Sequence, residues 1–396
     1  MRRHVSKLLA AQRDILSPQA IAAMDVAIAA LRETIGQGAD KAALLAQMDK
    51  LESEANKWLK PYPHAVWREN VEVFLVALAV AMAIRTFFLQ PFKIPTGSMQ
   101  PTLYGITHEN LADKADVKIP GRLARFIGYW LNGVSYVHVT AEAEGSLVNF
   151  DKAPSRFLLF NLRQNFQIGS RTYTVWFPPE KLLERAGLAY EDSNHEWHLN
   201  TKEFRAGEDI IKLKVTAGDH LFVNRITYNF RHPERGDIVV FKTSGIVRLG
   251  DQNTYYIKRL VGLGGERLQL KPDYELALKT RSEETIGVPV GHLVINGHEL
   301  SASTRHFEYL YSFPSLAKDA KTLPYHENRY FGHALLEGLS PGKEQTVSPD
   351  SYFVMGDNTM NSSDSRYWGD FTRNHVIGKS SFVYWPISSR FGWGYD

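Results

Sequence analysis

Residues 94–102 read Ile-Pro-Thr-Gly-Ser-Met-Gln-Pro-Thr, and they follow a long apolar run that we interpret as a membrane segment. Ser98 stands between a glycine and a methionine, a pattern that is unspecific by itself. Its position just beyond a lipid boundary suggests a nucleophile that works at the membrane surface. A serine hydroxyl needs a base to take its proton and donors to hold the oxyanion, so the rest of the chain must supply both.

The apolar run covers residues 71–89 and reads VEVFLVALAVAMAIRTFFL, in which only Glu72 and Arg85 are charged. As a helix it would span roughly 28 Å, close to the thickness of a hydrocarbon core. Arg85 lies about one turn from the end, where its stem can reach the headgroups. The alternative is a buried helix of a soluble protein, because the charge-free part is only residues 73–84. We expect an uncleaved signal anchor, since seventy residues precede it.

Basic residues on either side of the run indicate its direction. Lys57, Lys60 and Arg68 lie in the fifteen residues before it, and only Lys93 lies in the fifteen residues after it. Basic residues concentrate on the cytoplasmic side of a membrane segment. We therefore expect the N-terminus inside and the large C-terminal part outside.

The composition is that of an ordinary folded protein and excludes several kinds of site. Of 396 residues, 44% are hydrophobic and 22% are charged, which is enough material for two or three domains. The 46 basic residues nearly balance the 43 acidic ones, so there is no general case for nucleic-acid binding. Because the chain has no cysteine, disulfides, thiolate metal sites and cysteine nucleophiles are excluded.

Helical and β-type patterns divide the chain at the apolar run. Residues 1–60 are predicted to be helical, with one helix starting at Ser17-Pro18 and another over residues 40–59, before a proline-containing linker at 61–70. These helices form either a self-packed hairpin or a module for a membrane surface or partner. From residue 90 the chain is expected to be mainly β and mostly antiparallel. Strands are predicted at residues 171–177, 237–241, 255–257 and 380–385.

A base for Ser98 is not evident among the 14 histidines. His195 and His198 lie in a polar, loop-like stretch and lack the i, i+4 spacing of zinc proteases, so we expect no metal site. A neutral lysine is the alternative base, but desolvation must lower its pKa from near 10.4. Lys258 fits, because residues 255–262 form the apolar run Tyr-Tyr-Ile-Lys-Arg-Leu-Val-Gly. A solvent-facing lysine on an edge strand is the other interpretation.

A polar stretch at residues 356–369 is the third candidate element. It reads Gly-Asp-Asn-Thr-Met-Asn-Ser-Ser-Asp-Ser-Arg-Tyr-Trp-Gly, and such side chains either form a plain polar turn or position a neighbouring amine. Two other motifs predict no ligand site. Arg-Gly-Asp at 235–237 is expected to be the turn before a strand, and Gly-Leu-Gly-Gly at 262–265 lacks the spacing of a phosphate loop.

Taken together, these segments resemble the membrane-anchored bacterial signal peptidase I (leader peptidase) family of serine–lysine proteases. Four blocks carry the resemblance, in the family's order: PTGSMQPTL at 95–103, residues 219–242 ending in RGDIVVFK, YIKRLVGLGGE at 256–266, and GDNTMNSSDSRYWG at 356–369. The resemblance implies an antiparallel β catalytic domain of the signal peptidase/LexA-like type, preceded by the N-terminal helical segment and one transmembrane helix.

The resemblance also implies roles for residues in these blocks. Ser98 would be the nucleophile and Lys258 the general base. The Ser98 backbone N–H and the Thr96 hydroxyl would form the oxyanion hole, and Ser362 would orient the lysine amine. The residues expected to shape the surrounding loop through ion pairing are Asp357, Asp364 and Arg366. The residues expected beside the substrate are Ile94, Pro95, Tyr256 and Ile257.

By the same resemblance, the chain is expected to remove signal peptides from exported preproteins after an Ala-x-Ala-type site, through an acyl-enzyme. Its expected partners are those preproteins and the lipid bilayer, with no nucleic acid and no cofactor, and the oligomeric state stays open. The expected location is the inner (plasma) membrane, as a single-pass protein whose N-terminus is cytoplasmic and whose catalytic domain is extracytoplasmic.

The chain also departs from the family. Ser98 and Lys258 are 160 residues apart, far more than is usual, so we expect an insertion at about 106–212. Residues of about 267–350 would be the variable second domain. The sequence at 262–266 replaces the usual Gly-x-Pro-Gly-Asp, so we expect a looser loop there. Two other functions remain open: a noncatalytic membrane-anchored binding protein on the same fold, and a self-cleaving repressor of the LexA type.

Overall fold

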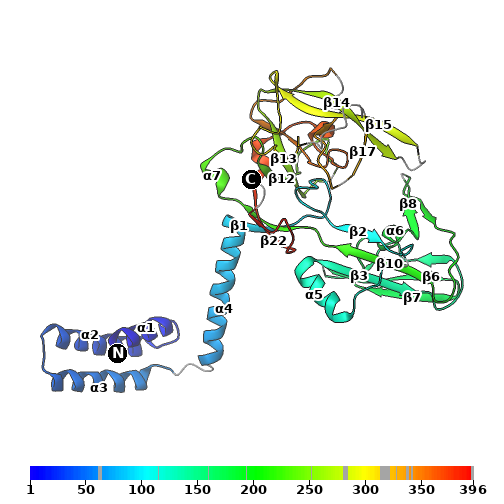
Figure 1. Ribbon diagram of the computed structural model, residues 1–396. Helices are drawn as coiled ribbons and strands as arrows, with labels where there is room; N and C mark the ends of the chain where they lie inside the picture. Colours follow the sequence, from blue (N-terminus) through cyan, green and yellow to red (C-terminus); the bar gives the residue numbers. More distant parts are fainter. Residues whose placement is uncertain are drawn as a thin grey trace. The chain divides into compact units, whose positions relative to one another are not determined.

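The computed structural model describes most of the chain, which Figure 1 colours along the sequence. The described residues are 1–60, 65–114, 116–158, 160–192, 194–250, 252–279, 284–312, 322–326, 328–335, 339 and 342–393. The proline break predicted at 61–63 therefore lies outside the described residues. The chain divides into two compact units, Met1–Ala81 and Met82–Asp396, and each is described by itself.

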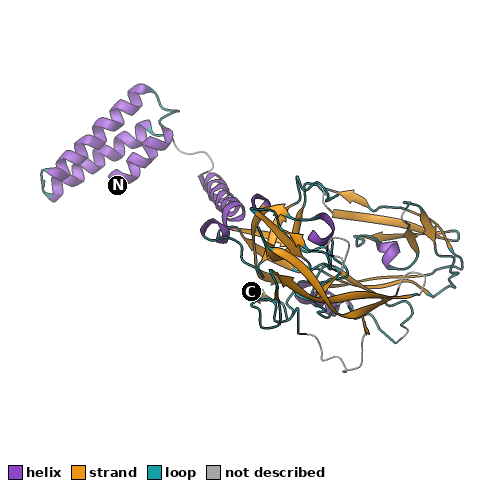
Figure 2. Cartoon of the chain, turned by 90° about the horizontal axis from the view of Figure 1, so that it is seen from above, coloured by secondary structure: helices purple, strands orange, loops and turns teal. Residues whose placement is uncertain are grey.

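The first unit begins with three helices, drawn in purple in Figure 2. They are α1 (Arg2–Gln12), α2 (Pro18–Gly36) and α3 (Lys41–Trp58). The side chains of Ser17 and Asp40 cap α2 and α3 by accepting backbone N–H bonds of 3.2 and 2.8 Å. Their apolar sides meet in a core that includes Met24, Leu31 and Leu51. The two helices predicted from the sequence are present, and α1 precedes them.

Helix α4 (Ala65–Ala83) continues into η1 (Ile84–Phe88), a single turn of π-helix. Among the described residues, the stretch Val66–Phe88 is the one helix long and apolar enough to cross a membrane, and none of it is buried. The core helix of a soluble protein would be buried, so this finding disfavours the alternative interpretation of residues 71–89 as a buried helix. The stretch begins at Val66, earlier than predicted. The charged residues Arg68 and Glu72 belong to the helix and form an i, i+4 ion pair at 3.0 Å. It ends at Phe88, because the next residue already belongs to a strand.

One eight-stranded antiparallel sheet forms the centre of the larger unit, in the order β1-β11-β22-β12-β13-β20-β21, with β23 paired to β22. Its strands are β1 (Leu89–Lys93), β11 (His220–Asn224), β12 (Ile238–Lys242), β13 (Tyr255–Leu263), β20 (Ser351–Met355), β21 (Phe371–Thr372), β22 (Val376–Trp385) and β23 (Gly392–Trp393). Short helices in its connections are α7 (Thr227–Phe230), α8 (Ser365–Trp368) and η3 (Arg373–His375).

Alternate side chains of β12 enter different cores. Val239 and Phe241 belong to one cluster, and Ile238 and Val240 belong to another that also holds Met99. Because successive residues of a strand point to opposite faces, β12 is covered on both sides. The segment after β1 therefore lies over one face of the central sheet, where its serine can meet β13.

A second sheet follows β13 and is dominated by one long hairpin. Its strands are β14 (Arg267–Lys279), β15 (Thr285–Ile295), β16 (His298–Glu299), β17 (Thr322–Pro324), β18 (His333–Ala334) and β19 (Gln345–Thr346). All pair antiparallel except β17, which runs parallel to β14. These strands occupy the region predicted as a variable second domain. Their core includes Val261 and Phe353 of the central sheet, so the two sheets pack together.

The turn between β13 and β14 is closed, so the expectation of a looser loop is wrong. The Glu266 N–H donates to the Leu263 carbonyl at 3.1 Å, and the Glu266 carboxylate accepts the Leu263 N–H at 2.7 Å. The same carboxylate pairs with Arg235. Gly265 has φ +86°, a left-handed conformation that glycine adopts without strain. Glutamate in place of the family's aspartate therefore fastens the turn.

The insertion has sheets and a core of its own. Its elements are β2 (Thr107–Asn110), α5 (Arg122–Asn132), β3 (Val134–Thr140), β4 (Leu147–Phe150), β5 (Ser155–Phe157), β6 (Phe160–Ile168), β7 (Arg171–Trp176), α6 (Leu182–Arg185), β8 (Ala189–Glu191), β9 (Trp197–Leu199) and β10 (Asp209–Thr216). They form the sheets β2-β10-β3 and β4-β6-β5 with β7 on β6, and the hairpin β8–β9. Phe166, Leu182 and Ile211 are buried together. The mainly-β antiparallel fold is thus confirmed, and β7, β12, β13 and β22 lie where strands were predicted.

Candidate active site

Ser98 lies in the turn that follows β1. The Gln100 N–H donates to the Gly97 carbonyl at 3.0 Å, and the Leu103 N–H donates to the Met99 carbonyl at 2.9 Å. Met99 and Leu103 are fully buried, so they fix the turn against the central sheet. Ser98 itself is 7% exposed. The apolar side chains around the serine therefore hold it in one position at the edge of the core.

Lys258 comes from the middle of β13, and its Nζ lies 2.6 Å from Ser98 Oγ. Strand β13 lies between β12 and β20, so Lys258 is on an internal strand and is only 4% exposed. The interpretation of a solvent-facing lysine on an edge strand is therefore wrong. The structure brings together the two residues that the sequence nominated as nucleophile and base.

Burial changes the acidity of Lys258. Desolvation disfavours the charged amine and lowers its pKa from 10.5 to about 8. The carboxylates of Asp364 and Asp357 oppose this decrease, whereas the guanidinium of Arg366 adds to it. A substantial fraction of Lys258 is therefore neutral near pH 8, as a proton acceptor for a serine hydroxyl must be.

A cavity of about 330 Å³ opens beside the Ser98–Lys258 pair. Pro95, Tyr256 and Ile257, three of the residues expected beside a substrate, line this cavity. Ile94 does not line it, because its side chain is 3% exposed and packs in the core around Met99. The assignment of Ile94 to the cleft is therefore wrong. Ile94 follows the end of β1, and its N–H donates to the Asp219 carbonyl at 2.9 Å, so it anchors the segment that Pro95 exposes.

Two hydrogen-bond donors lie at the serine, namely its own backbone N–H and the Thr96 hydroxyl. Thr96 is exposed and lines the cavity together with Ser98. In the described part of the chain, the Ser98 backbone N–H has no hydrogen-bond partner. A free N–H and a hydroxyl at the same cavity can both donate to a developing negative charge.

Asp357 of the polar stretch forms a buried ion pair with Arg259, the residue after Lys258. The guanidinium Nε and Nη2 donate to the two carboxylate oxygens at 2.8 and 2.7 Å. Thr102 Oγ1 donates to the same carboxylate. Desolvation lowers the pKa of Arg259, but the Asp357 carboxylate outweighs it, so the net shift is upward. The pair ties β13, the serine turn and the polar stretch together.

Asp364 and Arg366 form a second buried pair, as expected. Arg366 Nε and Nη2 donate to Asp364 at 2.8 and 2.7 Å, and the Gly356 N–H donates to the same carboxylate at 3.0 Å. Burial alone would raise the pKa of Asp364, but the guanidinium of Arg366 lowers it overall. The polar stretch is thus a rigid loop and not a plain turn.

Ser362 does not have the bond expected for it. Its Oγ is buried and forms no hydrogen bond to the Lys258 amine; it lies instead beside the Asp364 carboxylate, whose pKa it helps to lower. The oxygen lies against Gly356, where an added Cβ would overlap both Ser362 Oγ and the Ser98 carbonyl oxygen. Glycine at 356 thus permits the loop to approach the serine turn closely.

The sequence reasoning missed three residues that hold the site together: Arg259, Thr102 and Asn358. Asn358 connects the loop to the serine turn through two bonds, from its backbone N–H to the Ser98 carbonyl at 3.1 Å and from Nδ2 to the Gly97 carbonyl at 3.0 Å. A usable signal was present for Arg259, because an arginine inside an apolar strand needs a buried carboxylate partner.

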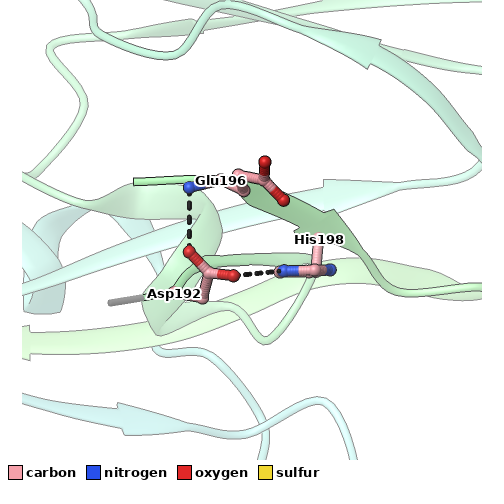
Figure 3. A group of neighbouring side chains, drawn as sticks. All are labelled: Asp192, Glu196 and His198. Carbon is pink, nitrogen blue, oxygen red and sulfur yellow. Dashed lines mark hydrogen bonds and ion pairs between the residues drawn. The ribbon is translucent and has the colours of Figure 1, made fainter. Parts of the chain in front are cut away.

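The histidines singled out in the sequence lie in the insertion. His198 belongs to β9 and not to a loop, and Asp192, Glu196 and His198 bring ligand-type atoms within 4.8 Å of one another. Figure 3 shows that the Asp192 oxygens already accept from His198 Nε2 and the Glu196 N–H, both at 2.9 Å. The backbone N–H of Asn194 donates as well, at 2.8 Å. The group is accounted for as a capped hairpin turn.

Comparison with known proteins covers the membrane stretch and the larger unit apart from most of the insertion. The sequence model of the family described as "Signal peptidase, peptidase S26" matches residues 67–125 and 211–385, which leaves most of the insertion unmatched. A signal peptidase I of Bacillus amyloliquefaciens is 32% identical over 171 residues, 43% of this chain and 68% of that protein.

A signal peptidase I of Leptolyngbya laminosa is 28% identical over 176 residues, 44% of this chain and 64% of that protein. A probable signal peptidase I of Synechocystis is 27% identical over 173 residues, 44% and 58% respectively. The match thus spans somewhat less than two thirds of the length of these two relatives. A solved signal peptidase I from Enterococcus faecalis is 27% identical, with 38% of this chain and 97% of that chain covered and a TM-score of 0.24.

Proposed function

The chain belongs to the signal peptidase family of peptidases, S26, and from this premise we propose that it is a membrane-bound serine endopeptidase that removes signal peptides from exported preproteins. The observation that carries the proposal is the 2.6 Å contact between Lys258 Nζ and Ser98 Oγ beside an open cavity. Both side chains are almost completely buried, so the contact is fixed before a substrate arrives.

In the proposed reaction, neutral Lys258 takes the hydroxyl proton of Ser98 while Oγ attacks the scissile carbonyl carbon. The oxyanion accepts hydrogen bonds from the Ser98 N–H and the Thr96 hydroxyl, and one such donor is worth about 3–4 kcal/mol. Protonated Lys258 then gives its proton to the leaving amine, which leaves an acyl-enzyme on Ser98. Neutral Lys258 activates a water that releases the acyl group and restores the serine.

The proposed substrate is an extended segment with small side chains, of the Ala-x-Ala type, ahead of the cleaved bond. Pro95, Tyr256 and Ile257 line the cavity beside the serine, and Tyr256 and Ile257 belong to strand β13. An extended peptide beside such a strand gains main-chain hydrogen bonds, and shallow pockets select its side chains. The larger unit would lie on the extracytoplasmic side of the inner membrane and the N-terminal helices in the cytoplasm, as the basic residues before the span favour.

Two other functions fit less well. A noncatalytic binding protein would not need a buried lysine held against a serine hydroxyl, since burial of that amine costs stability. A self-cleaving repressor would need a DNA-binding unit, whereas the apolar stretch Val66–Phe88 follows the N-terminal helices.

The test is mass spectrometry of an Ala-x-Ala preprotein incubated with the full chain in detergent. A single cut after the second alanine is expected for the wild type and none for Ser98→Ala or Lys258→Ala. Ser244→Ala is the matched control, because Ser244 is exposed and its hydroxyl, among the described residues, bonds only the Asn253 side chain; this variant should cleave normally. Cleavage that survives Ser98→Ala would refute the mechanism, and no cleavage by a folded wild type would favour the binding protein.

A further inference from the structure

Helix α5 of the insertion turns its apolar side outward. Leu123, Phe126, Ile127, Trp130 and Leu131 are 46–73% exposed and share one side of the helix, and no residue of the helix is buried. A surface helix of a globular protein ordinarily turns such a stripe towards the core. The orientation of α5, which Figure 1 shows next to β3, is therefore the reverse of the usual one.

The contacts that hold α5 come from its other side and its backbone. Tyr129 packs edge-to-face on Trp385, with 6.0 Å between ring centroids. Trp385 Nε1 donates to the Trp130 carbonyl at 2.7 Å, and the Ile387 N–H donates to the Leu131 carbonyl at 2.7 Å. Because these bonds anchor the helix to the end of β22, its outward apolar face is a fixed feature and not a frayed end.

A second apolar feature lies beside the first. At the turn between β5 and β6, Phe157, Leu158 and Phe160 are 64%, 81% and 67% exposed. Phe160 and Tyr129 of α5 line the same cavity, of about 520 Å³. Helix α5 and the β5–β6 turn therefore border one cavity, and we call the outward face of α5 together with this turn and cavity the α5–β6 surface. Exposed apolar surfaces of this kind mark contact with a partner or a membrane.

The charges around the α5–β6 surface are mainly positive. Arg122 and Arg125 lie on α5, and neither forms an ion pair with a described residue. The charged side chains that line the cavity are three basic residues and one acidic residue: Lys93, Arg156, Arg185 and Glu180. Aromatic and leucine side chains on one helix face, with arginines beside them, are the pattern of a helix that lies in a lipid interface.

The end of the membrane-spanning stretch is only a few residues away in the sequence from the cavity of the α5–β6 surface. The membrane-spanning stretch ends at Phe88, and β1 then runs from Leu89 to Lys93, which lines the cavity of the α5–β6 surface. Five residues of a strand cover at most about 17 Å. The short strand therefore keeps the α5–β6 surface near the bilayer in which the span ends.

From these observations we infer that the α5–β6 surface is a membrane-docking surface that inserts the apolar face of α5 among anionic lipid headgroups. It rests on the membrane-spanning role proposed for Val66–Phe88 and does not require catalysis. Docking would hold the insertion, and through Trp385 the central sheet, at a set height above the bilayer.

The absence of native cysteine makes a direct test simple, because one introduced cysteine is a unique labelling site. Ile127→Cys and Ile286→Cys place an environment-sensitive fluorophore at two isoleucines that are 47% and 46% exposed, on α5 and on the β14–β15 sheet. The full chain is reconstituted in phosphatidylcholine–phosphatidylglycerol nanodiscs that contain headgroup-proximal doxyl lipid. We expect strong quenching at 127 and little at 286.

A third label, Val76→Cys, separates the two proposals. Quenching at 76 by deep doxyl lipid reports the span, so its absence would overturn the membrane-spanning role itself. Quenching at 76 with equal, weak quenching at 127 and 286 would overturn only the docking of α5. If the label at 127 becomes shielded only when a preprotein is added, the surface binds a polypeptide and the lipid proposal is wrong.

The arginines and the aromatic side chains are tested separately. Arg122→Gln and Arg125→Gln should each lower the ratio of docked to undocked α5 about fivefold in discs with anionic lipid. They should have little effect in pure phosphatidylcholine, and equal effects in both lipids would refute the role of anionic headgroups. Phe126→Ser with Trp130→Ser should abolish quenching at 127 without changing the melting temperature, because both side chains are exposed.

Discussion

Replacing Lys258 by methionine should inactivate the protein and yet stabilise it at neutral pH. The pKa of Lys258 falls from 10.5 to about 8 on folding, because the amine is desolvated. One pKa unit corresponds to about 1.4 kcal/mol, so a protonated Lys258 costs the folded state about 3 kcal/mol. Methionine keeps the apolar stem and removes the charge, but it leaves Ser98 Oγ without its partner, at a cost of about 1 kcal/mol. The net gain is about 2 kcal/mol at pH 6.5.

The stabilisation by Lys258→Met should decrease as the pH rises. Between pH 8 and pH 10.5 the unfolded chain binds the lysine proton and the folded chain does not, so wild-type stability rises with pH in this window. Below about pH 8 both states bind the proton and the full penalty applies. The advantage of Lys258→Met should therefore shrink to nearly zero by pH 9.5.

The assay is urea unfolding of the detergent-solubilised chain, followed by tryptophan fluorescence at both pH values. Lys242→Met is the matched control, because Lys242 is an exposed lysine on the neighbouring strand β12, and its effect should not change with pH. A stabilisation by Lys258→Met that is the same at pH 6.5 and 9.5 would refute the argument from desolvation. So would a variant that is less stable than the wild type at pH 6.5.

Four further outcomes are expected. The wild-type kcat/KM for a preprotein should rise with pH and level off above about pH 8, where Lys258 is neutral, and a flat profile from pH 6 to 9 would contradict a lysine base. Asp357→Asn should destabilise the chain by about 3–5 kcal/mol in urea, since it breaks a buried ion pair. Its control is Glu344→Gln, which removes a partner of an exposed pair and should cost less than about 1 kcal/mol. Gly356→Ala should lower both kcat and the free energy of unfolding, because the added Cβ displaces the Ser98 turn. An unchanged kcat would show that the loop adapts to the methyl group. Addition of EDTA should leave cleavage unchanged, as no proposed step uses a metal, and a loss that zinc or magnesium restores would contradict this.

The proposed reacting pair could be predicted from the sequence because its chemistry is restrictive. A serine just after a membrane segment and a lysine among apolar residues are each unusual, and together with the other two blocks they match one family. What the sequence lacked was the distance between them, since Ser98 and Lys258 are separated by 160 residues. Only the pairing of β13 with β12 and the packing of Met99 bring them together.

The hydrogen bonds and ion pairs around Ser98 and Lys258 were harder to predict. They depend on which of two residues adjacent in the sequence turns its side chain inward. Arg259 pairs with Asp357 across 98 residues, and nothing local to either residue specifies that partner. The same difficulty explains Ile94, whose side chain enters the core while its neighbour Pro95 lines the cleft. For α5 the local pattern is a clear amphipathic helix, but only the tertiary contacts reveal that its apolar side faces outward.

The insertion begins and ends at one point of the fold. Strand β2 enters it and β10 leaves it, and the two strands pair so that Thr107 lies opposite Thr216. Such partners have Cα atoms roughly 5 Å apart, a gap that a two-residue turn can close. The whole stretch between these strands is therefore attached at one place, and replacing it by a two-residue turn would leave the flanking strands in register. A segment of more than a hundred residues can thus lie between Ser98 and Lys258 in the sequence and leave the contact between them unchanged.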